Sequence, residues 1–312
     1  MSKWTEDDIP DQAGRVALVT GANTGLGYET ARALAEHGAH VVLACRNADK
    51  AAAAEAKINA LEPSGSVEVL LTDMADLDGI AGSAAQFLAA HDRLDLLINN
   101  AGVMATPQGT TAQGFELQFG VNHLGHFALT ALLLPALAVA GAGSRVVNVS
   151  SNAHKFGKMN FDDLMGEGKY SPWGAYGQSK LSNILFTREL QRRLAHAGRE
   201  TISTVAHPGA SSTELGRDNA GGILSNLMAL TRPVTERLMS QSAAMGALPQ
   251  LRAAVDPDVS GGDYFGPDGM GEMKGHPKKV GMTDRAKNDG DAVLLWDASV
   301  ELTGADYSAL EN

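Results

Sequence analysis

Short apolar runs alternate with longer alanine-rich stretches over the first two thirds of the chain. The short β-branched runs predict strands at residues 16–20, 40–45, 67–72, 94–98, 145–150 and 201–206. The stretches between them predict helices at residues 25–37, 48–61, 77–91, 111–139 (bent at Pro135) and 175–197. The strand runs are continuously apolar, which is typical of parallel strands covered by helices on both faces. The pattern therefore predicts a doubly wound α/β fold with a parallel sheet of about seven strands.

The alternation stops after the last of these strands. Residues 210–249 carry Leu and Met at roughly helical spacing, and residues 293–302 predict a terminal helix. Residues 256–290 are rich in Gly, Pro, Lys and Asp and predict a loop, except for an edge strand at Tyr264-Phe265. The last third therefore adds no further regular strand–helix unit.

The composition is that of a globular chain that can bury a core, with 44% hydrophobic and 20% charged residues. No repeat or low-complexity linker divides it, so we expect a polar tail at residues 1–13 and a single domain at residues 14–312, which ends in a C-terminal extension at residues 256–312. The net charge of −11 excludes a broad basic surface for nucleic acid or an anionic membrane. The one cysteine, Cys45, excludes an intramolecular disulfide.

No segment predicts membrane insertion or secretion. Residues 1–13 lack the apolar core of a signal peptide. The longest apolar run, residues 128–140, is shorter than the ~20 residues that a membrane span needs. We therefore expect a soluble, cytoplasmic protein without a membrane anchor.

A glycine-rich loop, Thr20–Gly27, separates the first predicted strand from the first predicted helix. Its glycines would let the backbone approach a pyrophosphate, and the following helix offers free N–H groups at its positive end. An ordinary turn is the alternative for such a loop in isolation, but its place after a buried strand favours a dinucleotide cofactor in a Rossmann-type fold. The residues expected to hold the cofactor here are Gly21, Asn23, Thr24, Gly25, Leu26 and Gly27.

The second predicted strand ends in Ala44-Cys45-Arg46-Asn47, without a carboxylate. An Asp or Glu at this point would bind the ribose 2′-hydroxyl of NAD, whereas an arginine accommodates the 2′-phosphate of NADP. Arg46 therefore predicts that NADP(H) is preferred over NAD(H), although a strand-end arginine can also be a plain surface residue.

Ordered motifs along residues 14–210 resemble the short-chain dehydrogenase/reductase superfamily, classical type. The motifs are the loop Thr20–Gly27, Asp73 after the third strand, Asn99-Asn100-Ala101-Gly102 after the fourth, Asn122, Ser151, Tyr176-Gly-Gln-Ser-Lys180, and Pro208-Gly209 with Thr213. The resemblance implies a nicotinamide cofactor that is also contacted by Asp73, Met74, Asn100, Ala101, Gly102, Tyr176, Lys180, Pro208, Gly209 and Thr213. It implies catalysis by Ser151, Tyr176, Lys180 and Asn122.

Tyr176 and Lys180 stand at i and i+4, so one helix face carries both. A free tyrosine has a pKa of about 10, and a nearby ammonium lowers it toward the range where the phenol can exchange a proton. In isolation such residues are usually a surface pair, but the surrounding motifs favour catalysis. Of Ser150 and Ser151, the family pattern selects Ser151 to hold the substrate oxygen beside Tyr176. The resemblance also implies that the backbone carbonyl of Asn122 holds a water in a relay to Lys180.

The segment between Ser151 and Tyr176 is longer than in the classical pattern, and with residues 176–194 it resembles the retinol dehydrogenase-like branch, which includes the WW-domain oxidoreductase. The branch implies NADP(H)-dependent oxidation or reduction of a lipophilic alcohol or carbonyl. Residues 210–249 lie where the superfamily places its substrate lid, and their Leu and Met side chains suit an adaptable apolar pocket. The alternative is that residues 210–249 form a helix that packs against the sheet or a neighbouring subunit and contributes nothing to a substrate pocket. With Ser151 and Tyr176, the substrate candidates are Leu227, Met228 and Met245.

Two functions are compatible with these features. The first is an NADP(H)-dependent oxidoreductase acting on a carbonyl or alcohol, and the second is a non-catalytic NADP(H)-sensing protein on the same fold. A complete proton-relay set favours the enzyme, because a sensor has no use for it. The resemblance also implies a homodimer or homotetramer formed through residues 111–139 and 175–197. His123 and His126 lack a third ligand, so we expect no metal site.

Overall fold

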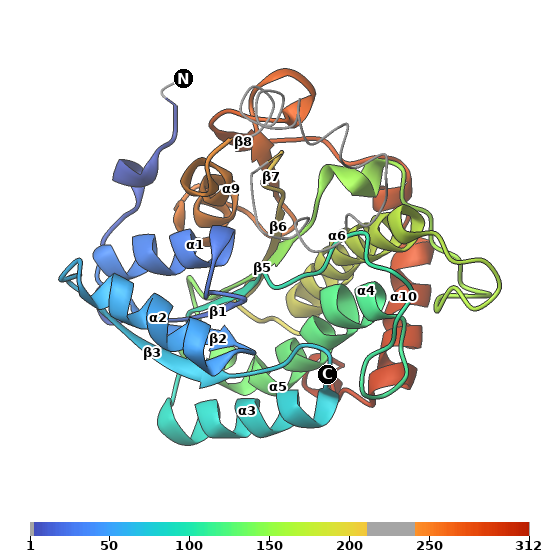
Figure 1. The fold of residues 1–312 in the computed structure, drawn as a ribbon, viewed down its shortest axis with the longest axis horizontal. Coiled ribbons are helices and arrows are strands. Elements are labelled where there is room, and N and C mark those ends of the chain that lie inside the picture. Colours follow the sequence, from blue (N-terminus) through green and yellow to red (C-terminus); the bar gives the residue numbers. More distant parts are fainter. Residues whose placement is uncertain (1–2, 211–240, 312) are drawn as a thin grey trace.

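An eight-stranded sheet forms the centre of the protein, which the computed structural model describes over residues 3–210 and 241–311 (Figure 1). The strand order is β3-β2-β1-β4-β5-β6-β7-β8, and all neighbours are parallel except β7 and β8. The strands are β1 Val16–Thr20, β2 His40–Cys45, β3 Ser66–Leu71, β4 Leu96–Asn99, β5 Arg145–Val149, β6 Ile202–Ala206, β7 Tyr264–Pro267 and β8 Pro277–Lys279. The predicted doubly wound parallel sheet is confirmed.

The sheet has one strand more than the sequence predicts. β8 comes from the segment 256–290, which reads as a loop apart from Tyr264-Phe265. β7 extends that predicted edge strand, and β8 pairs antiparallel with it, so that Phe265 lies opposite Lys279. A strand of only three residues, two of them exposed lysines, has no apolar pattern by which it could be predicted.

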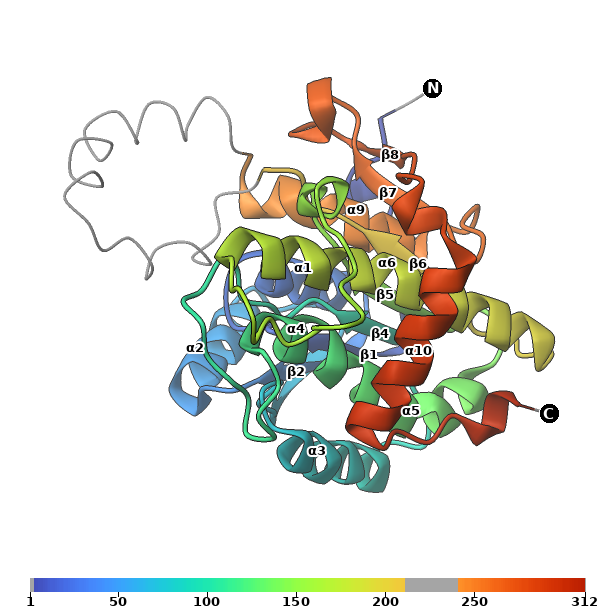
Figure 2. The same cartoon turned by 90° about the vertical axis from the view of Figure 1, so that its right-hand side faces the viewer.

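Helices cover both faces of the sheet (Figures 1 and 2). One face, into which Ala17 and Val19 of β1 point, is covered by α1 (Gly25–Glu36), α2 (Ala48–Asn59) and α9 (Ala243–Val255). The other face, into which Leu18 points, is covered by α3 (Leu77–Ala90), α5 (Gly125–Ala140) and α6 (Pro172–His196), with α10 (Asp289–Thr303) packed against α6. Short 3₁₀ turns occur at Glu6–Asp8, Asn152–Lys155, Met270–Glu272, Arg285–Lys287 and Ser308–Leu310. Because successive side chains of β1 enter opposite cores, the strand is apolar throughout.

The helical stretch before β5 is divided into three parts with different winding, and the bend expected at Pro135 stays a prediction. The single helix predicted at residues 111–139 is replaced by a short α4 (Leu117–Phe119), a π-helical turn over Gly120–Leu124, and α5, which contains Pro135. π-Helical turns are rare and are frequently found at functional sites, and this one carries Asn122. The stretch Leu117–Ala140 is long and apolar enough to cross a membrane, but 72% of its most apolar window is buried inside the protein.

The residues before β1, predicted as a polar tail, pack against the domain. Trp4 and Ile9 are buried in the core cluster that includes α1 and α9. Glu6 accepts two hydrogen bonds from the guanidinium of Arg32 on α1, both at 2.8 Å. His276 Nδ1 lies 3.1 Å from the Trp4 carbonyl oxygen. This segment therefore contacts both α1 and the C-terminal extension.

Candidate active site

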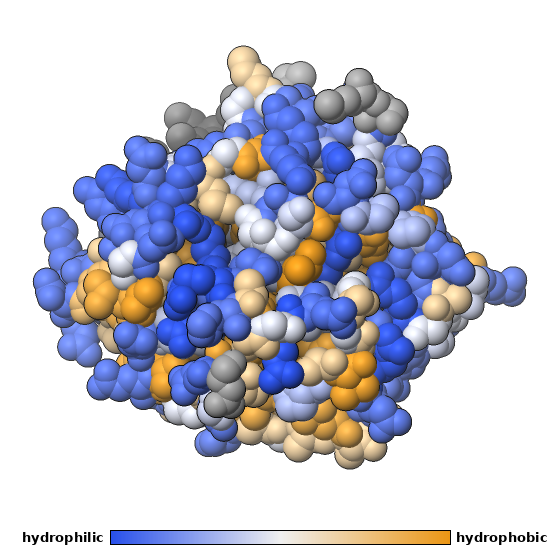
Figure 3. Space-filling view, turned by 180° about the vertical axis from the view of Figure 1, so that it is seen from behind, coloured by the Kyte–Doolittle hydropathy of each residue, from blue (hydrophilic) through white to orange (hydrophobic). Residues whose placement is uncertain are grey.

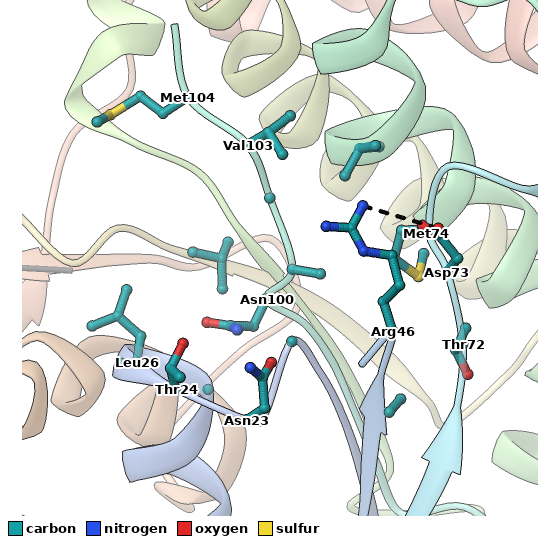
Figure 4. A pocket seen from close by; sticks show the side chains of 18 of the residues that line it. Asn23, Thr24, Leu26, Arg46, Thr72, Asp73, Met74, Asn100, Val103 and Met104 are labelled. Atoms are coloured by element: carbon teal, nitrogen blue, oxygen red, sulfur yellow. Dashed lines mark ion pairs between the residues drawn. The ribbon is translucent and has the colours of Figure 1, made fainter. Parts of the chain in front are cut away.

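A cavity of about 640 Å³ opens at the carboxyl ends of the central strands, where doubly wound sheets bind ligands (Figure 4). Most of the predicted cofactor residues line it: Gly21, Asn23, Thr24, Gly25, Leu26, Gly27, Arg46, Asp73, Met74, Asn100, Ala101, Gly102, Tyr176, Lys180 and Pro208. Gly209 packs against another loop, because a Cβ there would lie 2.3 Å from the Met273 carbonyl oxygen. Thr213 lies outside the described residues.

The glycine loop joins β1 to α1 at one wall of the cavity. A Cβ on Gly27 would lie 2.4 Å from the Gly21 carbonyl oxygen, so α1 can approach the loop this closely only without a side chain there. Among the described residues, the Thr24 side chain makes no capping hydrogen bond to α1. The first-turn N–H groups of α1 are therefore available to an anionic ligand, which fits the pyrophosphate of a dinucleotide.

The segment after β4 is tied to the end of β1 by Thr20. The Thr20 hydroxyl accepts the backbone N–H groups of Asn100 and Ala101, both at 2.9 Å, and Asn100 Nδ2 donates to the Thr20 carbonyl at 2.8 Å. His126 Nε2 lies 2.9 Å from the same hydroxyl, and burial lowers the pKa of His126 to about 3. A neutral His126 can accept the Thr20 proton, so one hydroxyl holds β1, the loop after β4 and α5 together beside the cavity.

One end of the cavity is formed where β2 and β3 end (Figure 4). The Arg46 side chain is 73% exposed, and its Nη1 lies 4.0 Å from Asp73 Oδ2, so solvent screens the pair. Lys50, in the first turn of α2, lines the same end, and its backbone N–H donates to Asn47 Oδ1 at 2.9 Å. Lys50 is not among the residues predicted from the sequence, although it stands only four residues after Arg46, at the start of the next helix. Two cations beside one carboxylate suit a phosphate ligand.

Tyr176 and Lys180 line the cavity from one face of α6, as their spacing predicts. Lys180 Nζ donates to the Val149 carbonyl at 3.1 Å and lies 5.8 Å from the centre of the Tyr176 ring. Burial lowers the pKa of Lys180 to about 8. Burial also raises the pKa of Tyr176, and a hydrogen bond with Ser151 opposes that rise. The sequence predicts a lowered pKa for Tyr176, but the structure raises it, because burial of the phenol is the largest influence and the hydrogen bond with Ser151 is the one that opposes it.

The two serines that follow β5 have different partners. Ser150 is buried, and its hydroxyl donates to the Lys180 carbonyl at 2.7 Å, which braces α6 against the strand. The Ser151 hydroxyl hydrogen-bonds with Tyr176 and accepts the N–H of Ala153 at 3.2 Å. The structure therefore brings Ser151, the serine selected from the sequence, to the phenol.

Asn122 holds the segment after β4 through its side chain. Its Oδ1 accepts the Val103 N–H at 2.8 Å, and its Nδ2 donates to the Val103 carbonyl and to Ser179 Oγ, both at 2.9 Å. A Cβ on Gly102 would lie 3.0 Å from Asn122 Oδ1 and 3.4 Å from Lys180 Nζ, so both side chains border the same glycine. The Asn122 backbone carbonyl lies 3.1 Å from His126 Nδ1 of α5. The role of this carbonyl in a proton relay stays a prediction.

The substrate candidates of the lid segment are not among the described residues that line the cavity. Leu227 and Met228 lie outside the described residues. Met245 lies in the first turn of α9 and packs against the core cluster of that face, so its contact with substrate stays a prediction. The apolar side chains that do line the cavity near Tyr176 and the segment after β4 are Val103, Met104, Leu117, Val121 and Val149.

Glu272, in the hairpin between β7 and β8, contacts the segments that follow β5 and β6 beside the cavity. Its carboxylate accepts hydrogen bonds from Lys155 Nζ at 2.9 Å and from His207 Nε2 at 3.1 Å. Because the Gly209 N–H donates to His207 Nδ1 at 3.2 Å, the proton of the neutral imidazole is on Nε2. Asn152, in the turn after β5, donates to the Glu272 carbonyl at 3.1 Å. The C-terminal extension therefore ties together the segments that follow β5 and β6, and no local pattern in the sequence predicts this.

This network makes stability depend on pH. The hydrogen bond from His207 is the main reason that the pKa of Glu272 falls from 4.5 to about 2. Because the folded-state pKa lies below the unfolded value, the stabilisation is complete above pH 4.5 and is lost as the pH falls toward 2. The fall in pKa corresponds to about 3 kcal/mol, which solvent screening of the partly exposed carboxylate reduces to roughly 2 kcal/mol. Glu272→Gln should therefore lower the free energy of unfolding by roughly 2 kcal/mol at neutral pH, and the deficit should shrink over that acidic range. Denaturant unfolding at several pH values measures it, with the exposed Glu301→Gln as control; a deficit independent of pH would contradict the assignment.

The chain has close relatives among known proteins. Residues 15–221 match the family model of the short chain dehydrogenases. Retinol dehydrogenase 12 of Mus musculus is 42% identical over 296 residues, which cover 94% of this chain and 88% of that protein. A crystal structure of an uncharacterized protein from Mycobacterium paratuberculosis has a TM-score of 0.80 and 42% identity, and covers 98% of this chain and 99% of that one.

A second similar structure was solved in complex with NADP. The NADP active-site complex of RhlG from Pseudomonas aeruginosa has a TM-score of 0.63 and 25% identity, and covers 81% of this chain and 94% of that one. The family match, the identity to curated relatives and the shared fold lead to one conclusion. The chain belongs to the short-chain dehydrogenase family and is an oxidoreductase that acts on CH–OH or C=O groups with a nicotinamide cofactor.

Proposed function

We propose that the protein is an NADP(H)-dependent oxidoreductase that interconverts lipophilic aldehydes or ketones and their alcohols. The observation that carries the proposal is a single cavity with Arg46 and Lys50 at one end and Tyr176, Lys180 and the adjacent Ser151 at another. Two cations beside one carboxylate favour a cofactor with a 2′-phosphate over one with a 2′-hydroxyl.

Residues of the chain would bind the substrate oxygen and transfer a proton to it. When bound, NADPH supplies a hydride for the carbonyl carbon. A tyrosine is protonated at neutral pH because its ordinary pKa is about 10, and burial raises the pKa of Tyr176 further. The Tyr176 hydroxyl would donate its proton to the carbonyl oxygen, and Ser151 would donate a hydrogen bond to the same oxygen. Lys180, with a pKa of about 8, is largely an ammonium at neutral pH and can hold the cofactor ribose.

These protonation states favour carbonyl reduction. Reduction needs Tyr176 as an acid, whereas alcohol oxidation needs its phenolate as a base. The acid form of a tyrosine prevails at neutral pH, and the burial that raises the pKa of Tyr176 makes its phenolate less accessible still. We therefore expect the carbonyl reductase direction to dominate there and alcohol oxidation to gain as the pH rises.

The lining of the cavity supports an apolar substrate. Val103, Met104, Leu117, Val121 and Val149 supply apolar surface beside the catalytic residues. Two curated relatives that match 94% and 93% of this chain carry the name retinol dehydrogenase 12, and retinol is a long, apolar alcohol. Both points favour a lipophilic carbonyl or alcohol over a sugar or a small hydroxy acid.

We also propose a cytoplasmic, self-associating protein without a nucleic-acid or membrane partner. The net charge of −11 disfavours contact with nucleic acid and with an anionic membrane surface. α10 packs against α6 and so covers part of the second helical region expected to mediate self-association. The exposed Leu132 and Val139 make α5 the better candidate for contact with a second copy.

NADPH consumption measured with aldehydes and ketones of increasing chain length tests the proposal. We expect turnover, with kcat/KM rising about fourfold per added methylene until the cavity is filled, because each buried methylene contributes about 0.8 kcal/mol. Tight NADPH binding with no turnover on any compound would instead favour a non-catalytic NADP(H)-sensing protein. Equal kcat/KM for NADPH and NADH would contradict the cofactor preference.

A further inference from the structure

A second group of side chains that can bind a metal lies near the beginnings of β2 and β3, at the opposite end of these strands from the cavity. His40 is the first residue of β2, Glu68 lies on the edge strand β3, and His91 is the C-cap residue that follows α3. One ligand atom from each residue lies within 4.8 Å of the others. The cavity is formed where β2 and β3 end, whereas this group lies near their beginnings, so the two sites are separate.

The three side chains already face one another. His91 Nε2 lies 2.7 Å from one Glu68 carboxylate oxygen, and His40 Nε2 lies 3.6 Å from the other. The two imidazole centres are 5.2 Å apart. His40 Nε2 is buried and has no hydrogen-bond partner among the described residues. A hydrogen bond between Glu68 and His91 explains one imidazole but leaves a buried nitrogen of the other unsatisfied, which is costly unless something binds there.

The surroundings prepare His40 for a ligand. Its Nδ1 lies 2.7 Å from Ser66 Oγ, a partner that can accept the Nδ1 proton and leave the Nε2 lone pair facing Glu68. The His91 ring is held against Phe87, with ring centres 4.7 Å apart. Metal-bound histidines characteristically have such an outer partner on the second nitrogen, because it sets both tautomer and orientation.

We propose that His40, Glu68 and His91 bind a divalent transition-metal ion, with Zn²⁺ as the expected occupant. Two imidazole nitrogens and one carboxylate are a known three-ligand set for zinc, with a fourth position left to water. Metal–ligand distances of about 2.0–2.2 Å require the three groups to move closer by small side-chain rotations. The ion would join β2, β3 and α3, so its expected effect is on stability and not on the reaction. This assignment departs from the expectation of no metal site, which rested on His123 and His126.

Titration of Zn²⁺ into tag-free, chelator-treated protein tests the site. We expect one equivalent to bind calorimetrically and to raise the midpoint of thermal unfolding, since a ligand of the folded state stabilises it. Ser66→Ala should weaken binding by about 10-fold or more, the usual effect of removing an outer partner. His40→Ala, His91→Ala and Glu68→Gln should each weaken it further. Co²⁺ bound in place of Zn²⁺ should show the absorption of a tetrahedral site.

The controls separate this site from adventitious binding and from misfolding. His196→Ala removes an exposed histidine at the end of α6 and should bind Zn²⁺ as the wild type does. The site variants should keep wild-type circular dichroism and NADPH binding, because none of their residues lines the cavity. No Zn²⁺ uptake by the wild type, or uptake that survives all three ligand substitutions, would overturn the proposal.

Discussion

Tyr176→Phe is expected to lower kcat by about 10²–10⁴-fold while leaving NADPH affinity nearly unchanged. The substitution removes only the hydroxyl, which is the proposed proton donor and the partner of Ser151. Lys180 keeps its hydrogen bond to the Val149 carbonyl, so the group expected to hold the cofactor ribose stays in place. Initial rates of NADPH oxidation and a fluorescence titration of NADPH check the two halves of this expectation.

Tyr307→Phe is the matched control for the loss of a buried hydroxyl. The Tyr307 hydroxyl donates to the Phe127 carbonyl at 2.8 Å in the core cluster between α5 and α10, outside the cavity. This variant should lose stability and keep its turnover. Near-wild-type turnover in Tyr176→Phe would refute the assignment of Tyr176 as proton donor.

Arg46→Asp is expected to reverse the cofactor preference from NADPH to NADH. The change removes a cation that can pair with the 2′-phosphate and introduces a carboxylate that repels it and can bind a 2′-hydroxyl. A hydrogen bond to a charged group contributes about 1.5–3 kcal/mol, so NADPH should bind roughly 10- to 150-fold more weakly. The ratio of kcat/KM for NADPH to that for NADH measures the reversal.

Lys57→Asp controls for the change in charge. Lys57 is exposed in the last turn of α2 and does not line the cavity, so the same reversal of charge should leave the NADPH to NADH ratio unchanged. If Arg46→Asp also left the ratio unchanged, Arg46 would not be the residue that recognises the 2′-phosphate.

Features that depend on neighbouring residues could be predicted from the sequence. The loop Thr20–Gly27 lies between a buried strand and a helix, and its glycine spacing shows where the backbone must approach a ligand. Arg46 follows from its place at a strand end, and Tyr176 and Lys180 follow from their separation of one helical turn. Each of these positions is set within a few residues of chain, and all of them line the cavity. The other cofactor residues found there, such as Asp73, are expected from the family resemblance and not from local spacing.

Features that depend on tertiary contacts could not be predicted. Glu272 meets Lys155 and His207 only because β7 pairs with β6 and brings its hairpin over the segment after β6. The direction of the Tyr176 pKa shift depends on how much water the folded chain excludes, which helical spacing does not reveal. The π-turn at Gly120–Leu124 also lacks a local signal, because its apolar pattern is that of a continuous helix.

The most direct test of the central claim follows the hydride itself. NADPH carrying deuterium at both positions of the reactive nicotinamide carbon is incubated with the best carbonyl substrate found in the chain-length series. We expect one deuterium on the former carbonyl carbon of the alcohol for each NADPH consumed. Alcohol formed without deuterium, or NADPH that binds tightly and is never consumed, would contradict the proposed reaction.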